Sequence, residues 1–228
     1  MKQTIIYISI LIILASAFSC KKGSKGDTSF LPNVSGSAGE VVLVLPKPLW
    51  TDSVGINYKE ILTQDFPYLP QREPIFDMIS IPPEAFNDIF KAHRNIIINE
   101  TSAEFKEPRF IIKRDVWASP QTILYVVGPN FTSISNFIKK EKDKLVAIFE
   151  QAERDRIIQN AIKYEESGIA TVLKQTFNAT IKVPKGFIIR KQTDNFVWIS
   201  NETPKISQGL IVYKCPYTEK NTFAAEYL

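Results

Sequence analysis

From residue 40 to residue 127, short apolar runs alternate with segments whose apolar residues recur at helical spacing. The run Val41-Val42-Leu43-Val44-Leu45 is continuous and ends at Pro46, which is typical of a strand buried on both faces. Apolar residues at every third or fourth position predict helices, and strict alternation predicts strands. In chain order, we expect a strand at 41–45, a helix at 55–66, a strand at 75–81, a helix beginning at Pro82-Pro83-Glu84, and strands at 95–99, 109–117 and 122–127.

A longer helical period follows the break at Gly128-Pro129-Asn130. Residues 132–163 keep this period, and its spacing shifts near 151–156, which predicts a kink or two consecutive helices. Beyond it, we expect a helix at 167–177 and strands at 180–183, 187–191, 196–200 and 209–214. The order of elements predicts an α+β (mixed α/β) protein, in which a βαβαβββ half precedes a helix-helix-antiparallel meander half.

The first twenty residues have the layout of a secretory signal that ends at a lipidation site. Lys2 is basic, residues 5–18 are apolar, and small residues lead up to Cys20. The apolar run is short for a membrane-spanning helix, which needs about 20 residues. We therefore predict a lipoprotein signal peptide at 1–19 and a diacylglycerol on the thiol of Cys20, with an uncleaved N-terminal anchor as the alternative.

The residues after Cys20 divide into a tether and a folded part. Residues 20–39 are rich in Lys, Gly and Ser and lack an apolar period, which is typical of a flexible linker. We expect residues 40–228 to fold as one α+β domain or as two subdomains, 40–128 and 129–228. The last residues, 221–228, resemble the start of a helix without a cap, so either the terminus frays or a C-terminal portion is missing.

Charge and cysteine content narrow the range of partners. Removal of residues 1–19 takes away one of the 28 basic residues and none of the 24 acidic ones, which lowers the net charge from +4 to +3. So mild a charge does not call for nucleic acid as a partner. With Cys20 acylated, Cys215 is the remaining cysteine, so we expect no internal disulfide and no disulfide-linked partner. We expect Cys215 to be a small buried side chain.

The single histidine limits the chemistry that the chain can perform. A Ser-His-Asp site, a Cys-His site and most zinc sites would have to use His93. Its neighbours Lys91 and Arg94 are cations, which disfavour both a metal ion and a protonated imidazole. A polar helix end explains these residues better. We therefore predict no catalytic residue, no cofactor and no metal ligand.

Binding residues are harder to select from the sequence. We expect Trp50, His93 and Arg94 to contribute if the chain binds a ligand, although Trp50, Trp117 and Trp198 are more typical of packing than of a carbohydrate platform. Carboxylates such as Asp115 and the pair Glu165-Glu166 fit solvated surfaces. The sequence thus favours a non-enzymatic binding or assembly module, with an envelope protein or a glycan as partner. The alternative is a carboxylate-dependent hydrolase that acts on envelope glycans.

Several short motifs spread over most of the chain point to a family. They are Val42-Leu43-Val44, Leu49-Trp50, Pro70-Gln71-Arg72-Glu73-Pro74-Ile75-Phe76-Asp77, Phe86, His93-Arg94-Asn95-Ile96, Val183-Pro184-Lys185-Gly186-Phe187, Asn195-Phe196-Val197-Trp198 and Pro216-Tyr217. In these motifs the chain resembles a family of uncharacterised lipoproteins of the Bacteroidota, the DUF4837 type. The resemblance implies an envelope lipoprotein of unknown function whose relatives extend further at the C-terminus, and it supplies no active site.

The resemblance also bears on which side of the membrane the protein occupies. Surface-export tags in these bacteria resemble acidic runs, whereas the residues after Cys20 read Lys21-Lys22-Gly23-Ser24-Lys25. We therefore expect a lipid-anchored protein of the cell envelope that faces the periplasm rather than the cell exterior.

Overall fold

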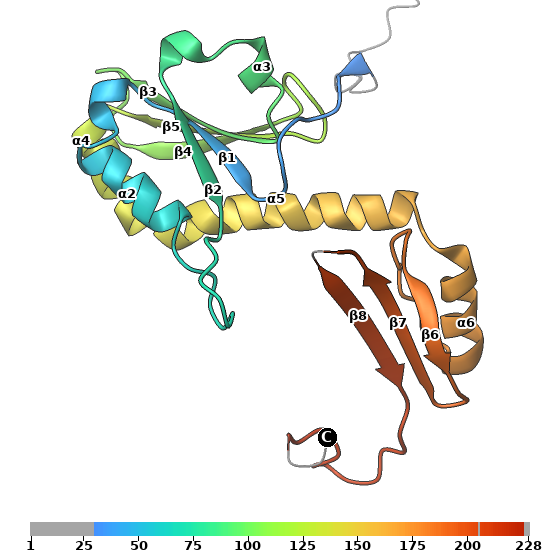
Figure 1. The fold of residues 1–228 in the computed structure, drawn as a ribbon. Coiled ribbons are helices and arrows are strands. Elements are labelled where there is room, and N and C mark those ends of the chain that lie inside the picture. The colour runs from blue at the N-terminus through green and yellow to red at the C-terminus, as the bar shows by residue number, and fades with distance from the viewer. Residues whose placement is uncertain (1–29, 205, 226–228) are drawn as a thin grey trace, which may run out of the picture. The chain divides into compact units, whose positions relative to one another are not determined.

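The computed structural model of the protein describes residues 30–204 and 206–225 (Figure 1). Its architecture is α+β, as predicted: an α/β half is followed by helices and then by a β-meander. The described residues divide into two compact units, with the boundary between Lys142 and Asp143. The predicted signal peptide, 1–19, and the predicted lipidation site, Cys20, lie outside the described residues. No described helix combines the length and the apolar character needed to cross a membrane.

The first unit is built on a five-stranded sheet with the strand order β2-β1-β3-β5-β4. Its strands are β1 (Glu40–Val44), β2 (Asp77–Ile81), β3 (Asn95–Thr101), β4 (Arg109–Arg114) and β5 (Thr122–Gly128). The first, second, third and fifth strands run parallel, and β4 pairs antiparallel with β5. The continuous Val and Ile runs suit such a sheet, because parallel strands are buried on both faces.

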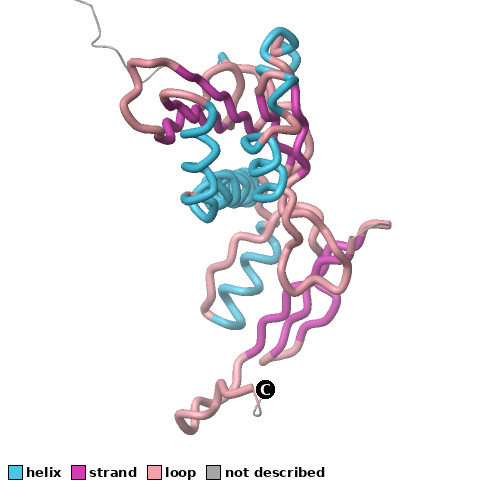
Figure 2. The backbone as a smooth tube through the Cα atoms, turned by 90° about the vertical axis from the view of Figure 1, so that its left-hand side faces the viewer, coloured by secondary structure: helices cyan, strands magenta, loops and turns pink. Residues whose placement is uncertain are grey.

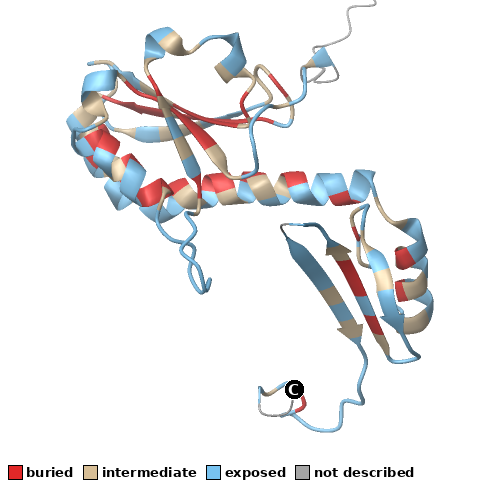
Figure 3. Ribbon diagram, in the orientation of Figure 1, coloured by how far each residue is buried: buried red, intermediate tan, exposed pale blue. Residues whose placement is uncertain are grey.

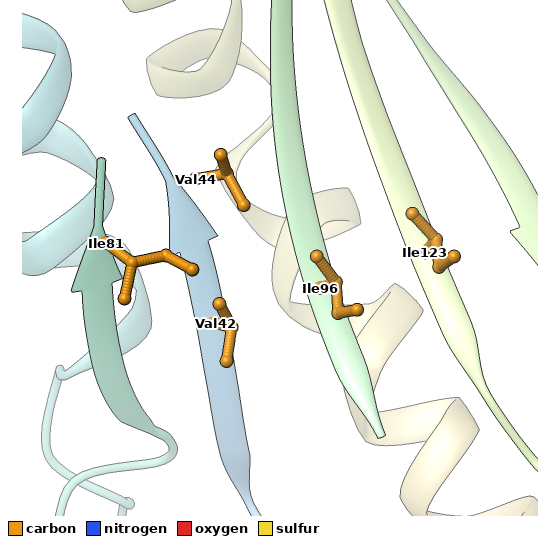
Figure 4. Close-up of a cluster of buried hydrophobic side chains, with 5 residues drawn as sticks. All are labelled: Val42, Val44, Ile81, Ile96 and Ile123. Atoms are coloured by element: carbon orange, nitrogen blue, oxygen red, sulfur yellow. The ribbon is translucent and has the colours of Figure 1, made fainter. Parts of the chain in front are cut away.

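Helical segments cover both faces of this sheet (Figure 1). On one face, Phe86 and Phe90 pack against a cluster of Val and Ile side chains; Phe86 ends the turn η3 (Pro83–Ala85), and Phe90 belongs to α3 (Asp88–Lys91). Figure 4 shows this cluster, which consists of Val42, Val44, Ile81, Ile96 and Ile123. The opposite face is covered by α2 (Ser53–Leu62) and α4 (Phe131–Lys140), which contact each other.

Side-chain caps define where these helices begin. Asp52 accepts a hydrogen bond from the backbone N–H of Ser53, and Asn130 accepts one from that of Ser133 at 2.9 Å. Such caps satisfy N–H groups that lack a partner within the helix. At its other end, α2 stops at Leu62, before the predicted end at residue 66.

The second unit contains two helices and a small antiparallel sheet. The helices are α5 (Lys142–Lys163) and α6 (Ser167–Phe177), and the strands are β6 (Ile188–Gln192), β7 (Phe196–Glu202) and β8 (Ser207–Tyr213), in the order β6-β7-β8. Helix α6 lies along one face of the sheet (Figure 2). The core between them is formed by Ile169, Leu173, Val183, Val197 and Ile199.

Two predictions for this region need correction. The long helical pattern does form two consecutive helices, but the break lies at Glu141 and not near residues 151–156, where α5 is continuous. Ile157 and Ile158, just after the predicted break, are 63% and 54% exposed, so the shift in spacing coincides with a change in burial within one helix. Residues 180–183 form no strand, because Val183 packs into the core without joining the sheet.

The end of the predicted tether makes backbone contacts with the first unit. Asn33 forms an isolated bridge with Ser119, and Ser35 forms one with His93. The N–H of Ser35 donates to Ala92 O at 2.8 Å, and the N–H of Arg94 donates to Ser35 O at 3.1 Å. Residues 33–35 therefore lie beside the start of β3. The sequence does not show these contacts, because they are purely backbone contacts.

Candidate functional site

The candidate residue His93 lies in a closed setting at the amino end of β3. Its side chain is 10% exposed, and its Nε2 lies 3.2 Å from Glu40 Oε2 without a well-directed hydrogen bond. Gly36 forms the opposite wall: it adopts φ +88°, and a Cβ there would lie 2.5 Å from two imidazole atoms. Gly36 is thus required both by its backbone conformation and by the approach of the ring.

The electrostatics of this pair favour a neutral histidine beside a charged carboxylate. Burial lowers the pKa of His93, and this effect outweighs the opposing one of Glu40. The pKa of Glu40 is lowered chiefly by the hydrogen bond that its Oε2 accepts from the N–H of Ser37 at 2.9 Å. Since the imidazole is enclosed by Gly36 and Glu40, its position is that of a structural residue.

The carbonyl groups at the end of α3 bond to Gln121, and not to the cationic side chains that the sequence suggested for this role. Its Nε2 donates to Lys91 O at 2.6 Å and to His93 O at 2.7 Å, which satisfies carbonyls at the end of α3. Its Oε1 accepts from the N–H of Trp117 at 3.1 Å. This buried amide joins α3 to the β4–β5 hairpin. Arg94 contributes through its backbone, since its C=O accepts from the N–H of Thr122 at 2.9 Å.

Trp50 is the candidate residue that borders open space. Its indole Nε1 donates to Leu45 O at 2.8 Å, so the half-buried ring is held at the end of β1. Packing of α2 also positions it, because a Cβ on Gly55 would lie 2.4 Å from Leu49 O and 2.5 Å from Trp50 O. The ring therefore has a defined orientation.

Two neighbouring hollows share Trp50 and Lys59. The first, of about 360 Å³, is lined by Leu43, Leu45, Trp50, Gly55, Lys59, Met78 and Ser80. The second, of about 490 Å³, is lined by Trp50, Thr51, Ile56, Lys59, Glu60 and Thr63. Together they offer an aromatic ring, a cation and hydroxyl groups.

The structure does not bring the three candidate residues into one site. Trp50 follows the carboxyl end of β1, whereas His93 and Arg94 precede β3 and lie beside Glu40 at the amino end of β1. Because β1 and β3 are parallel, Trp50 lies near the carboxyl ends of these strands, and His93 and Arg94 lie near their amino ends.

A polar pair that the sequence did not suggest lies near the carboxyl ends of β1 and β3, as Trp50 does. The hydroxyl of Tyr58 donates to Asn99 Oδ1 at 2.7 Å, and Asn99 Nδ2 donates to Val44 O at 3.2 Å. Burial raises the pKa of Tyr58. The available signal was the polar Asn99 directly after the apolar run Ile96-Ile97-Ile98. Each of these contacts is internal, so the pair orders the end of the sheet.

The candidate carboxylates are engaged in structural contacts. Glu165 Oε2 lies 2.6 Å from Lys182 Nζ, Glu166 Oε1 accepts from the N–H of Gly186 at 3.1 Å, and Asp115 Oδ1 accepts from the N–H of Gln121 at 2.8 Å. Within residues 30–204 and 206–225, no group of three or more His, Cys, Asp or Glu side chains could hold a metal ion.

The outer face of the three-stranded sheet carries large apolar side chains that are exposed. We use this name for the exposed side chains on the side away from α6. Ile188, Trp198, Ile211 and Tyr213 are 49%, 41%, 57% and 51% exposed. Trp198 is therefore only partly packed, with its indole beside Gly209 of the neighbouring strand, whereas Trp117 packs edge-on against Phe86 with ring centroids 5.5 Å apart.

A hollow of about 540 Å³ adjoins the outer face. It is lined by Asn195, Phe196, Ile211, Tyr213, Cys215, Pro216, Thr218 and Thr222. Cys215 is a free, exposed thiol, so its predicted burial was wrong. The chain leaves β8 beyond Tyr213, which places Cys215 outside the sheet.

Comparison with known families divides the chain into two parts. Residues 34–162, more than half of the chain, match the model described as Domain of unknown function (DUF8532). The chain belongs to this family. Residues 166–228 match Domain of unknown function (DUF4837), which confirms the expected likeness for the C-terminal part. The motifs from Val42 to Ile96 fall within the DUF8532 match instead. No curated protein and no solved structure matched the chain.

The junction of the two matches falls between α5 and α6. The DUF8532 match ends at residue 162, near the end of α5, and the DUF4837 match begins at residue 166, just before α6. The outer face therefore belongs wholly to the DUF4837 part, and Trp50 and His93 belong to the DUF8532 part.

Proposed function

We propose that this DUF8532 protein is a lipid-anchored protein of the cell envelope that acts as a non-enzymatic binding or assembly module. The observation that carries the binding role is the outer face of the three-stranded sheet. Four large apolar side chains, Ile188, Trp198, Ile211 and Tyr213, are each between 41% and 57% exposed on one face. Clustered exposed apolar side chains are typical of surfaces that bind other macromolecules.

The chemistry of this face favours a protein partner over a glycan. Trp198 and Tyr213 combine a large apolar ring with one polar group, as residues at protein interfaces commonly do. Burial of the aliphatic side chains Ile188 and Ile211 by a partner would remove them from water, which favours binding. A glycan would need polar groups available around the rings, whereas the polar side chains of this face, Arg190, Ser200 and Glu202, already bond to one another.

The alternative function, hydrolysis by a carboxylate pair, has less support. That mechanism needs two carboxyl groups about 5–10 Å apart across a cavity. In the linings of the three hollows described above, Glu60 is the single carboxylate. Glu165 and Glu166 make structural contacts instead.

The partner-binding role is tested by capture from the envelope. Full-length protein and the variant Trp198→Glu would be isolated under identical conditions, and the proteins that accompany them compared. Ile112→Glu on β4 is the matched control, because Ile112 is also a large exposed residue on a strand, at 45%. We expect Trp198→Glu alone to lose a specific partner. Equal recovery from all three proteins would contradict the proposal.

The lipid anchor is tested separately at Cys20. The small residues before this cysteine predict cleavage and acylation, so Cys20→Ala should abolish membrane attachment. Fractionation of cells into membrane and soluble material measures this. A variant that is cleaved yet remains in the membrane would contradict the proposed anchor.

The periplasmic orientation follows from the basic residues Lys21, Lys22 and Lys25 after the proposed anchor. Protease treatment of intact cells should leave the protein uncut, and permeabilised cells should lose it. Rapid digestion in intact cells would place the protein on the cell exterior.

A further inference from the structure

The two sheets end in four edge strands, and three of these carry features that discourage further pairing. Strand β4 has Arg109, Lys113 and Arg114, and β6 has Arg190, Lys191 and a register shift between Ile189 and Lys191. Strand β2 begins with Asp77 and is followed by Pro82. Charges, bulges and prolines at edges are the usual means of preventing strand addition.

Strand β8 lacks all of these features. Its seven residues, Ser207 to Tyr213, include no charged residue and no proline, and they pair with β7 without a register shift. Among the described strands, only β7 pairs with it. An uncharged, regular edge of this length is a ready template for another strand. Figure 3 shows that β8 is largely exposed.

The hydrogen-bond phase identifies which residues of β8 face away from β7. The N–H of Lys214 donates to Asn195 O, and the N–H of Thr203 donates to Ile206 O, both at 2.9 Å. Residues of an antiparallel strand bond alternately to either side. Even-numbered residues of β8 therefore bond to β7. The backbone N–H and C=O groups directed away from β7 are those of Ser207, Gly209, Ile211 and Tyr213.

These residues are complementary to a second copy of the same strand. If two β8 strands pair antiparallel with Leu210 opposite Leu210, then Gly209 faces Ile211 and Ser207 faces Tyr213, each twice by symmetry. Small side chains thus meet large ones, and no like charges meet. This register also keeps the antiparallel hydrogen-bond pattern, since the residues whose backbone groups point away from β7 lie opposite one another in the two copies.

The surroundings of β8 provide apolar contacts for such a pair. Trp198 Nε1 lies 3.6 Å from the position of a Cβ on Gly209, so the indole lies beside that glycine on the outer face. Ile211 of a second copy, opposite Gly209, would pack near this indole. On the other face, Leu210 and Val212 are only partly buried against the core, and Leu210 would meet its counterpart.

We propose that two copies of the chain pair through β8, antiparallel and centred on Leu210, so that their three-stranded sheets join into one. This inference rests on the proposed function in one respect: confinement of both copies to a membrane raises their effective concentration. It also specifies the assembly role proposed above, because the dimer would present two outer faces as one surface.

Disulfide trapping tests the register of the pair. Leu210→Cys would be made in the full-length chain with Cys215→Ser, and the membranes oxidised mildly. In the proposed pair the two Leu210 residues form a non-hydrogen-bonded pair, whose Cα atoms lie about 4.5 Å apart, within the range of a disulfide. We expect a covalent dimer. Val212→Cys on the same face and Cys215→Ser alone are the controls, and neither should cross-link.

A charge substitution tests the pairing without relying on a cysteine. Ile211→Lys should convert a dimer of the detergent-extracted protein into a monomer by sedimentation velocity. Ile188→Lys is the matched control, because Ile188 is exposed on the same face to a similar extent but lies on β6. It should remain dimeric. Circular dichroism would show whether both variants are folded.

Failure of the pairing can be told apart from failure of the proposed function. Absence of the Leu210→Cys dimer, together with a monomeric wild-type protein, would overturn the pairing even if Trp198-dependent capture of a partner succeeded. A dimer equally sensitive to both lysine substitutions would also overturn it, since only Ile211 lies at the proposed edge. Conversely, a dimer that dissociates into monomers with Ile211→Lys but not with Ile188→Lys would support the pairing even if no partner were captured.

Discussion

The five-stranded sheet of the first unit is covered on both faces, whereas the three-stranded sheet of the second unit is covered on one. In the first sheet, Val42 and Ile96 on one face and Leu43 and Ile97 on the other are all at most 1% exposed. In the second, Val197 is buried toward α6, while its neighbour Trp198 is 41% exposed. The first sheet therefore uses its apolar residues for its own core, and the second leaves large apolar side chains exposed on one face.

The largest effect that this comparison predicts is a core truncation in the first sheet. Ile97→Ala removes a fully buried side chain from β3 and leaves a cavity, so we expect a loss of about 2–5 kcal/mol in the free energy of unfolding. Urea denaturation followed by circular dichroism measures this. A loss below about 1 kcal/mol would show that this sheet is not the tightly packed region of the protein.

A second contrast uses two glycines, one in each unit. Gly36→Ala should cost about 1–3 kcal/mol, because the residue adopts φ +88° and a Cβ would collide with His93. Gly168→Ala in α6 is the matched control, because nothing lies within 4 Å of its Cβ position and alanine favours a helix. Thermal unfolding should show a lower melting temperature for the first variant only. Equal melting temperatures would mean that residues 33–40 do not pack against His93.

A smaller effect concerns the pH dependence of stability. Because burial lowers the pKa of His93 in the folded state, the unfolded chain binds more protons as the pH falls through about 6.5. The contribution of neutral His93 is therefore present above that pH and is lost as the pH falls toward the folded-state pKa. The difference in unfolding free energy between wild type and His93→Gln should shrink from neutral pH to about pH 5. A difference that grows on acidification would contradict the lowered pKa.

The smallest effect is expected on the outer face. Ile188→Ala shortens a side chain that is already 49% exposed, so stability should change by less than about 1 kcal/mol. The same denaturation assay as for Ile97→Ala provides the comparison. A loss as large as that of Ile97→Ala would show that the outer face is part of a core and not a binding surface.

Local patterns predicted the strands of the first sheet well because their burial on both faces makes them continuous apolar runs. The run of residues 41–45 and the run Ile96-Ile97-Ile98 each became a central strand. In the meander, Phe196 to Ile199 are apolar without interruption, so the sequence could not show that Trp198 faces outward. Residues 180–183 alternate like a strand, although Val183 is buried without a ladder.

The candidate site was predictable only in part, for a related reason. Trp50 was singled out by residue type, and it lines two hollows. The enclosure of His93 depends on Gly36 and Glu40, which are distant in the sequence, and no local pattern reports such a contact. The edge position of β8 among the described strands likewise depends on strand order, which the sequence does not show.

The most direct test of pairing through β8 is hydrogen exchange of its backbone amides in the full-length, detergent-extracted protein. The amides of Leu210 and Val212 bond to β7 and should be protected at every protein concentration. Those of Gly209 and Ile211 point away from β7, so we expect them to exchange rapidly in dilute protein and to become protected as the protein concentration rises. Rapid exchange of Gly209 and Ile211 at all concentrations would contradict the claim that this edge is an interaction surface.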